Sequence, residues 1–366
     1  MKYRIAFDNH VFRMQKRGGA SRYYLELANY LQKSKNFEAR ILAPLHFSEV
    51  LNSDPVFSKR NLYLKHSGNK IGIARFINSL SDSFTGNQIN KYEPSLVHET
   101  YYKSDVLWNK SIPSVCTILD LTREIIDGNM QKLDRKIQTA ERATRIICIS
   151  ENTRRDFLKF APGLAEKTVV VPLGCSKVFL EEDNSQSGFD KPFILYVGQR
   201  GGYKNFSLLL RAISSLNEFR GDFDLIAFGG GNFTKTEKAE IEQLGLTIRV
   251  KYAFGDDQTL STYYKSAVCF VYPSLYEGFG IPILEALASG CRVICSETSS
   301  FPEVGLGLVQ YFDPRDVQSL CAEITSVFQS QTISEDWKIQ AHAHALDFTW
   351  EKVGCKTMNE YLKILE

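Results

Sequence analysis

The sequence lacks long hydrophobic runs and a leader-like beginning. No apolar stretch among its 366 residues approaches the ~18–20 residues that a membrane-spanning helix needs. The first ten residues, MKYRIAFDNH, have the pattern of a strand that ends in polar residues, not of a signal peptide. We therefore expect a cytoplasmic protein without a membrane span.

Motifs for metal, ATP and dinucleotides are also missing. The eight cysteines are scattered, and Cys291 and Cys295 have no histidine or further cysteine at zinc spacing. Buried, reduced thiols are expected, and no metal site. The stretch GQRGGYKN lacks the order of a Walker sequence, and no dinucleotide fingerprint follows the first strand. These absences count against ATP chemistry and a dehydrogenase.

Charge is unevenly distributed along the chain. Residues 1–175 carry 27 Lys and Arg against 17 Asp and Glu, whereas residues 176–366 carry 17 against 25. The basic half could meet an acidic partner. Val56–Leu80 holds five basic residues and no acid among leucines and aromatics. Such a mixture could seat on an anionic membrane surface, with an ordinary solvated basic face as the alternative.

Short apolar runs alternate with helical patterns in both halves of the chain, which predicts doubly wound parallel sheets. A polar, acidic stretch at 174–191 reads as a linker, and 366 residues suit two domains. We predict domains at 1–175 and 176–349, followed by an amphipathic C-terminal helix. The predicted strands are Tyr3–Asp8, Ala39–Ala43, Ser95–His98, Ser114–Leu119, Arg145–Ser150, Thr168–Pro172, Phe193–Val197, Phe223–Phe228, Thr247–Tyr252, Val268–Tyr272 and Arg292–Cys295.

The stretch Val271–Pro302 concentrates the features of a ligand site. Pro282 suits the start of a short helix and Gly290 the residue just past its end, so the glycine-bearing loop Tyr276–Gly280 lies at a helix N-terminus. Such a terminus favours an anion. Glu277 and Glu285 flank it, and paired carboxylates beside an anion site suggest a phosphorylated polyol. A capped core helix with two solvated acids is the plainer alternative.

Two further glycine-bearing loops follow predicted strands. One carries Arg200 and Lys204, with Asn205 placed to cap the next helix. These cations could face a phosphate at the strand ends, where ligands of open α/β sheets collect, or they could be solvated. The other carries Gly18 and Gly19, which would let a ligand approach backbone amides, or form an ordinary turn.

Together, GGASRY, ISENTRRD, YVGQRGGYKNF and PSLYEGFGIPILEALASG resemble the retaining glycosyltransferases of family 4. The resemblance covers nearly the whole chain, and its most specific element is the E-x7-E spacing of Glu277 and Glu285. It implies the GT-B fold, in which two Rossmann-like domains face each other across a cleft and the tail helix at 350–366 packs back on the first domain.

The resemblance also implies roles for residues. Glu285 would accept hydrogen bonds from the donor ribose, and Glu277 would bind the transferred sugar. Arg200 and Lys204 would hold the diphosphate, so that no metal or other cofactor is needed. Backbone amides would contact the donor, those of Gly278, Phe279 and Gly280 from one domain and those of Gly18 and Gly19 from the other.

One departure concerns the sugar-facing end of a strand. Many relatives carry a His-Asp pair where this chain has Leu119 and Asp120. Asp120 could still bind substrate or could cap a loop. His98 and His10 are candidates for the same cleft, although a core or loop position for His98 is the alternative. The departure bears on the identity of the donor sugar.

These features predict a retaining, metal-independent hexosyltransferase of bacterial surface polysaccharide synthesis. Its donor would be a nucleotide sugar such as a GDP- or UDP-sugar and its acceptor a glycan or lipid-linked glycan, with peripheral contact at the inner face of the cytoplasmic membrane and no nucleic acid partner. The alternatives are a non-catalytic GT-B partner subunit and a nucleotide-sugar epimerase.

Overall fold

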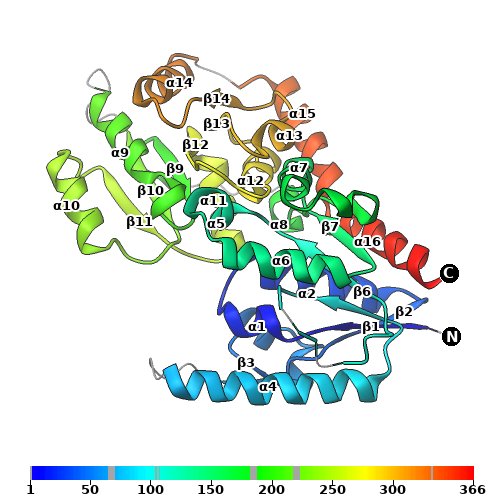
Figure 1. The fold of residues 1–366 in the computed structure, drawn as a ribbon. Helices are drawn as coiled ribbons and strands as arrows, with labels where there is room; N and C mark the ends of the chain where they lie inside the picture. Colours follow the sequence, from blue (N-terminus) through cyan, green and yellow to red (C-terminus); the bar gives the residue numbers. More distant parts are fainter. Residues whose placement is uncertain are drawn as a thin grey trace. The chain divides into compact units, whose positions relative to one another are not determined.

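The computed structural model describes residues 2–64, 71–103, 105–106, 108–181, 188–216, 223–330 and 333–366, with only the backbone of 71–79 (Figure 1). The chain forms two compact units, unit 1 (Met1–Leu173 with Trp350–Glu366) and unit 2 (Gly174–Thr349). The boundary that the sequence predicts, after residue 175, lies two residues beyond the one observed.

Unit 1 is built on a six-stranded sheet with the order β2-β1-β5-β6-β7-β8. Every pairing in it is parallel. The strands are short and largely buried, as expected of a sheet that helices cover on both faces. They are β1 (Tyr3–Phe7), β2 (Phe37–Ile41), β5 (Leu96–Glu99), β6 (Ser114–Ile118), β7 (Arg145–Cys148) and β8 (Thr168–Val170), beside a small ribbon of β3 (Leu45–His46) and β4 (Leu62–Tyr63).

The helices of unit 1 connect these strands, and the C-terminal helix joins them from the far end of the sequence. α16 (Trp350–Leu365) packs against α2 (Gly19–Lys33). A Cβ at Gly354 would lie 2.2 Å from the ring of Tyr30, so only glycine permits this close approach. The other helices are α1 (His10–Met14), α3 (Glu49–Asn52), α4 (Ile71–Tyr92), α5 (Thr122–Asp127), α6 (Met130–Arg142) and α7 (Glu151–Phe160).

Unit 2 repeats the architecture with the strand order β11-β10-β9-β12-β13-β14, again parallel throughout. Its strands are β9 (Phe193–Val197), β10 (Asp224–Phe228), β11 (Val250–Ala253), β12 (Cys269–Tyr272), β13 (Val293–Ser296) and β14 (Gln310–Phe312). Its helices are α8 (Lys177–Leu180), α9 (Phe206–Ser215), α10 (Lys235–Gln243), α11 (Asp257–Ser266), α12 (Ile281–Ala288), α13 (Phe301–Gly305), α14 (Val317–Gln329) and α15 (Glu335–Ala345).

Each sheet has one point at which the direction of winding reverses. In unit 1 this point lies between β1 and β5, and in unit 2 between β9 and β12. Ligands of doubly wound sheets bind beyond the carboxyl ends of the strands at such a point. The predicted α/β fold class is confirmed, and the topology directs attention to four loops, those after β1, β5, β9 and β12.

Some local predictions need correction. Asn205 precedes α9 but does not cap it with its side chain, because its backbone is left-handed (φ 56°) and its side-chain amide donates to the carbonyl of Pro314 at 2.9 Å. The predicted linker contains the short helix α8, and residues 182–187 within it lie outside the described part. Within the described residues, no helix is both long and apolar enough to span a membrane.

His98 is a core residue of unit 1, so its assignment as a candidate ligand contact is withdrawn. It is fully buried at the end of β5, where Nδ1 lies 2.5 Å from the Tyr361 hydroxyl and Nε2 2.8 Å from Oγ1 of Thr117. Its ring also stacks on Phe7, with centroids 5.5 Å apart. Both ring nitrogens thus hold protein partners, one of them on α16, and His98 fastens the last helix to the sheet.

The burial of His98 predicts acid sensitivity. Burial lowers the pKa of His98 to about 3, whereas an unfolded histidine titrates near about 6.5. Below about pH 6.5 the unfolded state binds a proton at His98, whereas the folded state does not bind it until the pH approaches about 3. The stability associated with neutral His98 is therefore complete above about pH 6.5 and is lost as the pH falls. For His98 alone we expect the free energy of unfolding to fall by about 2 kcal/mol between about pH 7 and about pH 5.

Urea unfolding at several pH values checks this expectation. His98→Gln retains a polar side chain but cannot titrate, so its stability should depend less steeply on pH over this window. Equal pH slopes in the variant and the parent would contradict the assignment.

Candidate functional site

Two loops of unit 2 meet at its switch point. The chain leaves β9 through Gly198–Asn205 and leaves β12 through Pro273–Gly280. A backbone hydrogen bond joins them, in which the amide of Leu275 donates to the carbonyl of Tyr203 at 2.7 Å. The two segments that the sequence predicts to bind phosphate and sugar are therefore neighbours in space.

An ion pair bridges the same two loops. Nζ of Lys204 lies 2.6 Å from Oε1 of Glu277, and their side chains are 15% and 14% exposed. The ammonium also donates to the hydroxyl of Tyr272 at 3.2 Å and lies 5.3 Å from the centre of that ring. An ammonium has three N–H donors. In the described part of the chain, two of these donors bond Glu277 and Tyr272, and the third can bond a ligand.

The Glu277 loop is fixed from the end of β13. Oγ of Ser299 accepts from the amide of Glu277 at 3.1 Å, and the hydroxyl of Ser300 donates to the carbonyls of Glu277 and Phe279. Gly280 precedes α12 with φ 119°, and a Cβ there would lie 3.1 Å from the ring of Phe301. Both its conformation and its surroundings therefore require glycine.

Glu285 is the fifth residue of α12, one turn from its start and within the same unit. It is 8% exposed, and its Oε2 accepts a hydrogen bond from the hydroxyl of Tyr264 at 3.3 Å. With Glu277 in the loop before the helix, this places the predicted acids on either side of the N-terminus of α12. The helix dipole there favours the negative charge of a ligand.

Arg200 is held by four protein groups. Its side chain is 2% exposed, and Nε lies 2.8 Å from Oε1 of Glu237. Its terminal nitrogens donate to the carbonyls of Gly229, Gly231 and Asn232 at 2.8, 2.7 and 3.2 Å. The guanidinium thus fastens the loop after β10. These contacts give no support to a direct bond between Arg200 and a diphosphate, which stays a prediction.

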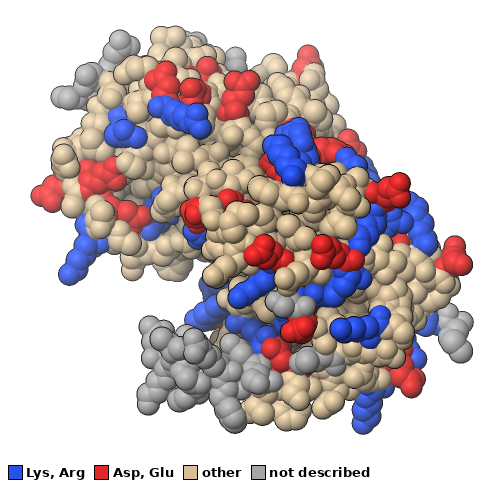
Figure 2. All heavy atoms as spheres, in the orientation of Figure 1, with Lys and Arg blue, Asp and Glu red and all other residues tan. Residues whose placement is uncertain are grey.

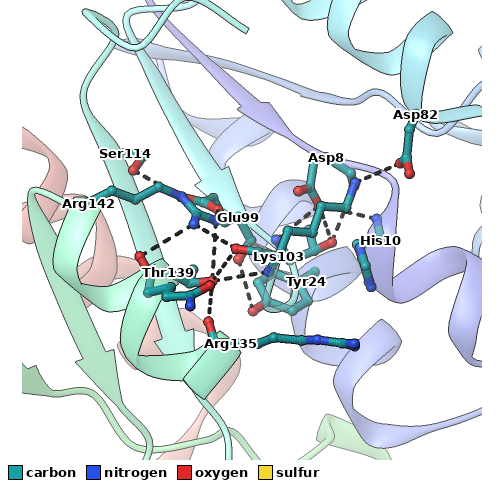
Figure 3. A network of polar contacts seen from close by, with 12 residues as sticks. Asp8, His10, Tyr24, Asp82, Glu99, Lys103, Ser114, Arg135, Thr139 and Arg142 are labelled. Carbon is teal, nitrogen blue, oxygen red and sulfur yellow. Dashed lines mark hydrogen bonds and ion pairs between the residues drawn. The ribbon is translucent and has the colours of Figure 1, made fainter. Parts of the chain in front are cut away.

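In unit 1 a polar network lies at the switch point between β1 and β5 (Figure 3). Asp8 follows β1, and its Oδ1 accepts from the amides of His10 and Thr100 at 3.2 and 3.1 Å, and from the Thr100 hydroxyl. The carboxylate therefore ties the loop after β1 to the loop after β5.

Charged side chains continue this network toward α4. Asp82 accepts from Nζ of Lys103 at 2.7 Å and from the guanidinium of Arg13 at 2.8 Å. The ring of His10 stacks on Tyr101, with centroids 5.4 Å apart. Burial, followed by the charge of Lys103, lowers the pKa of His10 to about 4. His10 is thus a neutral imidazole beside an ion-paired cluster. Such a site suits uncharged polar groups of a ligand, such as hydroxyls.

The remaining predicted residues of unit 1 have structural contacts of their own. Oδ1 of Asp120 accepts from the amide of Thr122 at 3.0 Å, a local turn just before α5, whose N-cap residue is Leu121. Gly18 and Gly19 lie at the start of α2, as the sequence predicts for that loop. A Cβ at Gly18 would lie 2.4 Å from Oε1 of Gln15, which also accepts from the amide of Ser21. Contacts of these residues with a donor stay predictions.

The structure therefore brings together Lys204, Glu277 and the glycine-bearing loop before α12, whereas the contacts of Arg200 are with the loop after β10 and with α10. Sequence reasoning missed Tyr264 and Tyr272. Tyr272 ends an apolar strand, in which a tyrosine reads as core, whereas Tyr264 lies in a mostly polar helix with no motif around it. The signal that could have found Tyr272 is a hydroxyl-bearing ring shortly before the loop that carries Glu277.

Two family models match the chain almost end to end. The model described as Glycosyltransferase Family 4 matches residues 17–177, and the one described as Glycosyl transferases group 1 matches residues 180–344. These spans divide the chain near the boundary between the two units.

Curated relatives and a solved structure agree with these models. The O-antigen chain mannosyltransferase B of Escherichia coli is 30% identical over 237 residues, 61% of this chain and 62% of that protein. The serotype-specific mannosyltransferase WbdA of Escherichia coli is 25% identical over 272 residues, 68% of this chain but only 32% of its own length. The chain thus spans less than two thirds of the length of these relatives.

The crystal structure of the Anabaena protein Alr3699/HepE in complex with UDP superimposes with a TM-score of 0.72 at 17% identity, covering 99% of this chain and 100% of that one. At this identity the likeness shows the fold, which is the GT-B fold. The chain belongs to glycosyltransferase family 4.

Proposed function

We propose that this protein is a retaining glycosyltransferase that moves a hexose from a nucleoside-diphosphate sugar to a hydroxyl of a surface glycan or its lipid-linked precursor. The observation that carries the proposal is the Lys204–Glu277 pair, 2.6 Å apart, at the switch point of unit 2 and before the N-terminus of α12. Family membership supports it, and so do the names of the two Escherichia coli relatives, which are mannosyltransferases. Mannose is therefore the first sugar to test.

The chemistry of transfer suits this geometry. Breaking the bond between sugar and diphosphate builds positive charge on the anomeric carbon and negative charge on the departing phosphate. Lys204 would use its third N–H donor on that phosphate while two donors keep it in place. A fixed cation stabilises the developing charge without reorganisation. Glu277, held beside it, would accept hydrogen bonds from the hydroxyls of the transferred sugar.

We propose no metal and no other cofactor for this step. Among the residues that the structure describes, no three histidine, cysteine or acidic side chains come together as a metal site. The cation of Lys204 and the dipole of α12 would supply the positive potential. Retention of configuration would follow from attack on the same face of the sugar, with the departing phosphate accepting the proton of the acceptor hydroxyl.

Donor turnover tests the assignment of Lys204 and Glu277. Lys204→Ala and Glu277→Ala should each lower kcat with a GDP- or UDP-hexose by ~10²–10³, the usual cost of losing one preorganised electrostatic contact in a transition state. Lys338→Ala and Glu335→Ala break an exposed pair of the same 2.6 Å separation and serve as controls that keep the parent rate. Near-parental rates in both site variants would refute the site.

A second comparison separates two roles for Arg200. We propose that it holds the loop after β10, because its guanidinium bonds Glu237 and three carbonyls. Arg200→Ala and Glu237→Gln should then both raise the KM for the donor by about tenfold, the order expected from one lost charged hydrogen bond. A large loss of kcat in Arg200→Ala, with Glu237→Gln unaffected, would instead establish direct contact with the diphosphate.

The proposed lipid-linked acceptor implies peripheral contact with a membrane. In the described part of the basic segment, Val56 and Leu62 are 48% and 60% exposed, and Lys59 and Arg60 are exposed beside them. A hollow of about 220 Å³ adjoins this patch and edge strand β2, with Phe57 in its wall. Lys65 and Lys70, and the side chain of Arg75, lie outside the described part. Figure 2 shows basic and acidic side chains interspersed on the face that it draws.

Flotation with vesicles tests the membrane contact. The protein should float with vesicles that contain anionic lipid and dissociate from them as salt rises, because the attraction is screened. Lys59→Glu with Arg60→Glu should weaken binding about tenfold or more, at about 1 kcal/mol for each basic residue near the surface. Lys235→Glu with Lys238→Glu changes the same charge in α10 and should bind as the parent. If vesicle binding changes neither with salt nor with Lys59→Glu and Arg60→Glu, the membrane contact is refuted.

A further inference from the structure

Two buried tyrosine hydroxyls lie against the two glutamates of the unit 2 site. Tyr272 ends β12 and is 3% exposed, whereas Tyr264 lies in α11 and has no exposed surface. Eight positions separate the two tyrosines, and eight also separate Glu277 from Glu285. The contacts are crossed along the chain: Tyr264 contacts Glu285, and Tyr272 contacts Glu277.

Tyr272 is the third member of a closed group with Lys204 and Glu277. Its hydroxyl accepts from Nζ of Lys204 at 3.2 Å and donates to the carboxylate of Glu277, while Lys204 and Glu277 are themselves 2.6 Å apart. One hydroxyl thus fixes both charges at once. A carboxylate has about four lone-pair positions, so Glu277 retains acceptor capacity for the hydroxyls of a sugar.

The Tyr272 hydroxyl remains a donor at any physiological pH. Burial, and next the charge of Glu277, raise the pKa of Tyr272 well above its usual range. A phenol that does not ionise holds the neighbouring carboxylate in one orientation. Loss of the hydroxyl would leave the largely enclosed Glu277 carboxylate, 14% exposed, with one hydrogen bond fewer. Of the other two members of the group, Lys204 alone would then orient it.

Tyr264 stands in the same relation to Glu285. Its hydroxyl donates to Oε2 at 3.3 Å, and burial raises its pKa well above the usual range. Its ring is wedged edge-on between Phe179 and Phe270, with centroids 5.9 and 5.4 Å away. The aromatic contacts leave the ring little freedom, so the position of the hydroxyl is set by the core of unit 2.

We propose that Tyr272 and Tyr264 are positioning residues, each of which orients the carboxylate of one glutamate for the donor. The inference rests on the proposed function, since Glu277 would act on the transferred sugar and Glu285 on the ribose. The core of the unit thereby sets the geometry of the site: one tyrosine comes from the strand and the other from the helix that precedes it.

The two tyrosines should affect different kinetic constants. Tyr272→Phe removes an orienting bond at the reacting sugar, so kcat should fall about tenfold while the donor KM changes little, as expected for an interaction that matters chiefly in the transition state. Tyr264→Phe acts at the ribose, where binding is the same before and during transfer. The donor KM should therefore rise about threefold to tenfold with kcat nearly unchanged.

A double-mutant cycle separates positioning from general packing. If Tyr272 acts through Glu277, then Tyr272→Phe should have almost no further effect on kcat in a Glu277→Gln background. Tyr311→Phe, a change of the same kind in β14, serves as the matched control and should keep both constants. Urea unfolding of each variant establishes that the fold is retained at the assay temperature.

Each result decides one question. Nonadditive losses with the stated split between kcat and KM support the inference. Two results with an active parent protein would overturn the inference and leave the proposed function in place. One is that the losses of Tyr272→Phe and Glu277→Gln multiply in the double variant. The other is that Tyr272→Phe and Tyr264→Phe both keep the parental kcat and KM. A parent that turns over no GDP- or UDP-hexose, with or without glycan acceptor, refutes the proposed function instead, and the inference falls with it.

Discussion

The site of unit 2 depends on one ion pair held between two loops. Lys204 comes from the loop after β9 and Glu277 from the loop after β12, and these loops become neighbours only because the sheet reverses its winding between those strands. A pair this enclosed is costly to desolvate, and the fold offsets that cost with a buried hydroxyl and a helix N-terminus nearby. The charges are thus fixed before a ligand arrives, which is the condition for electrostatic stabilisation of a departing phosphate.

The surroundings of the pair are held by bonds between side chains and backbone. Serines after β13 secure the Glu277 loop, and Arg200 with Glu237 secures the loop after β10. Unit 1 has a comparable arrangement at its own switch point. There Asp8 ties two loops together, and Asp82 forms ion pairs with both Arg13 and Lys103. In both units, residues with polar side chains order the loops, and the parallel strands only bring them near one another.

Sequence patterns were sufficient for the sheets and for the core of the site. Short apolar runs located the strands of both large sheets except β14, because a buried parallel strand is almost wholly apolar. The glycines and the two acids of the Val271–Pro302 stretch located the helix and its loop. What the patterns could not give was the direction of a side chain whose partner is distant. Arg200 meets Glu237 37 positions away, and His98 meets Tyr361 263 positions away. Arg200 was predicted to bind the donor, and for His98 a ligand contact and a core position were both open, because these partners are visible only in the folded chain. Tyr272 was overlooked for the same reason, since spacing shows that it is buried but not that its hydroxyl reaches two charges.

The most direct measurement is a crystal structure of the protein with a bound nucleoside diphosphate, GDP or UDP. The account predicts a phosphate oxygen about 2.8 Å from Nζ of Lys204, beside the N-terminus of α12, with the bonds of Lys204 to Tyr272 and Glu277 still in place. A diphosphate bound elsewhere on the chain, with the Lys204–Glu277 pair closed and untouched, would contradict the central claim.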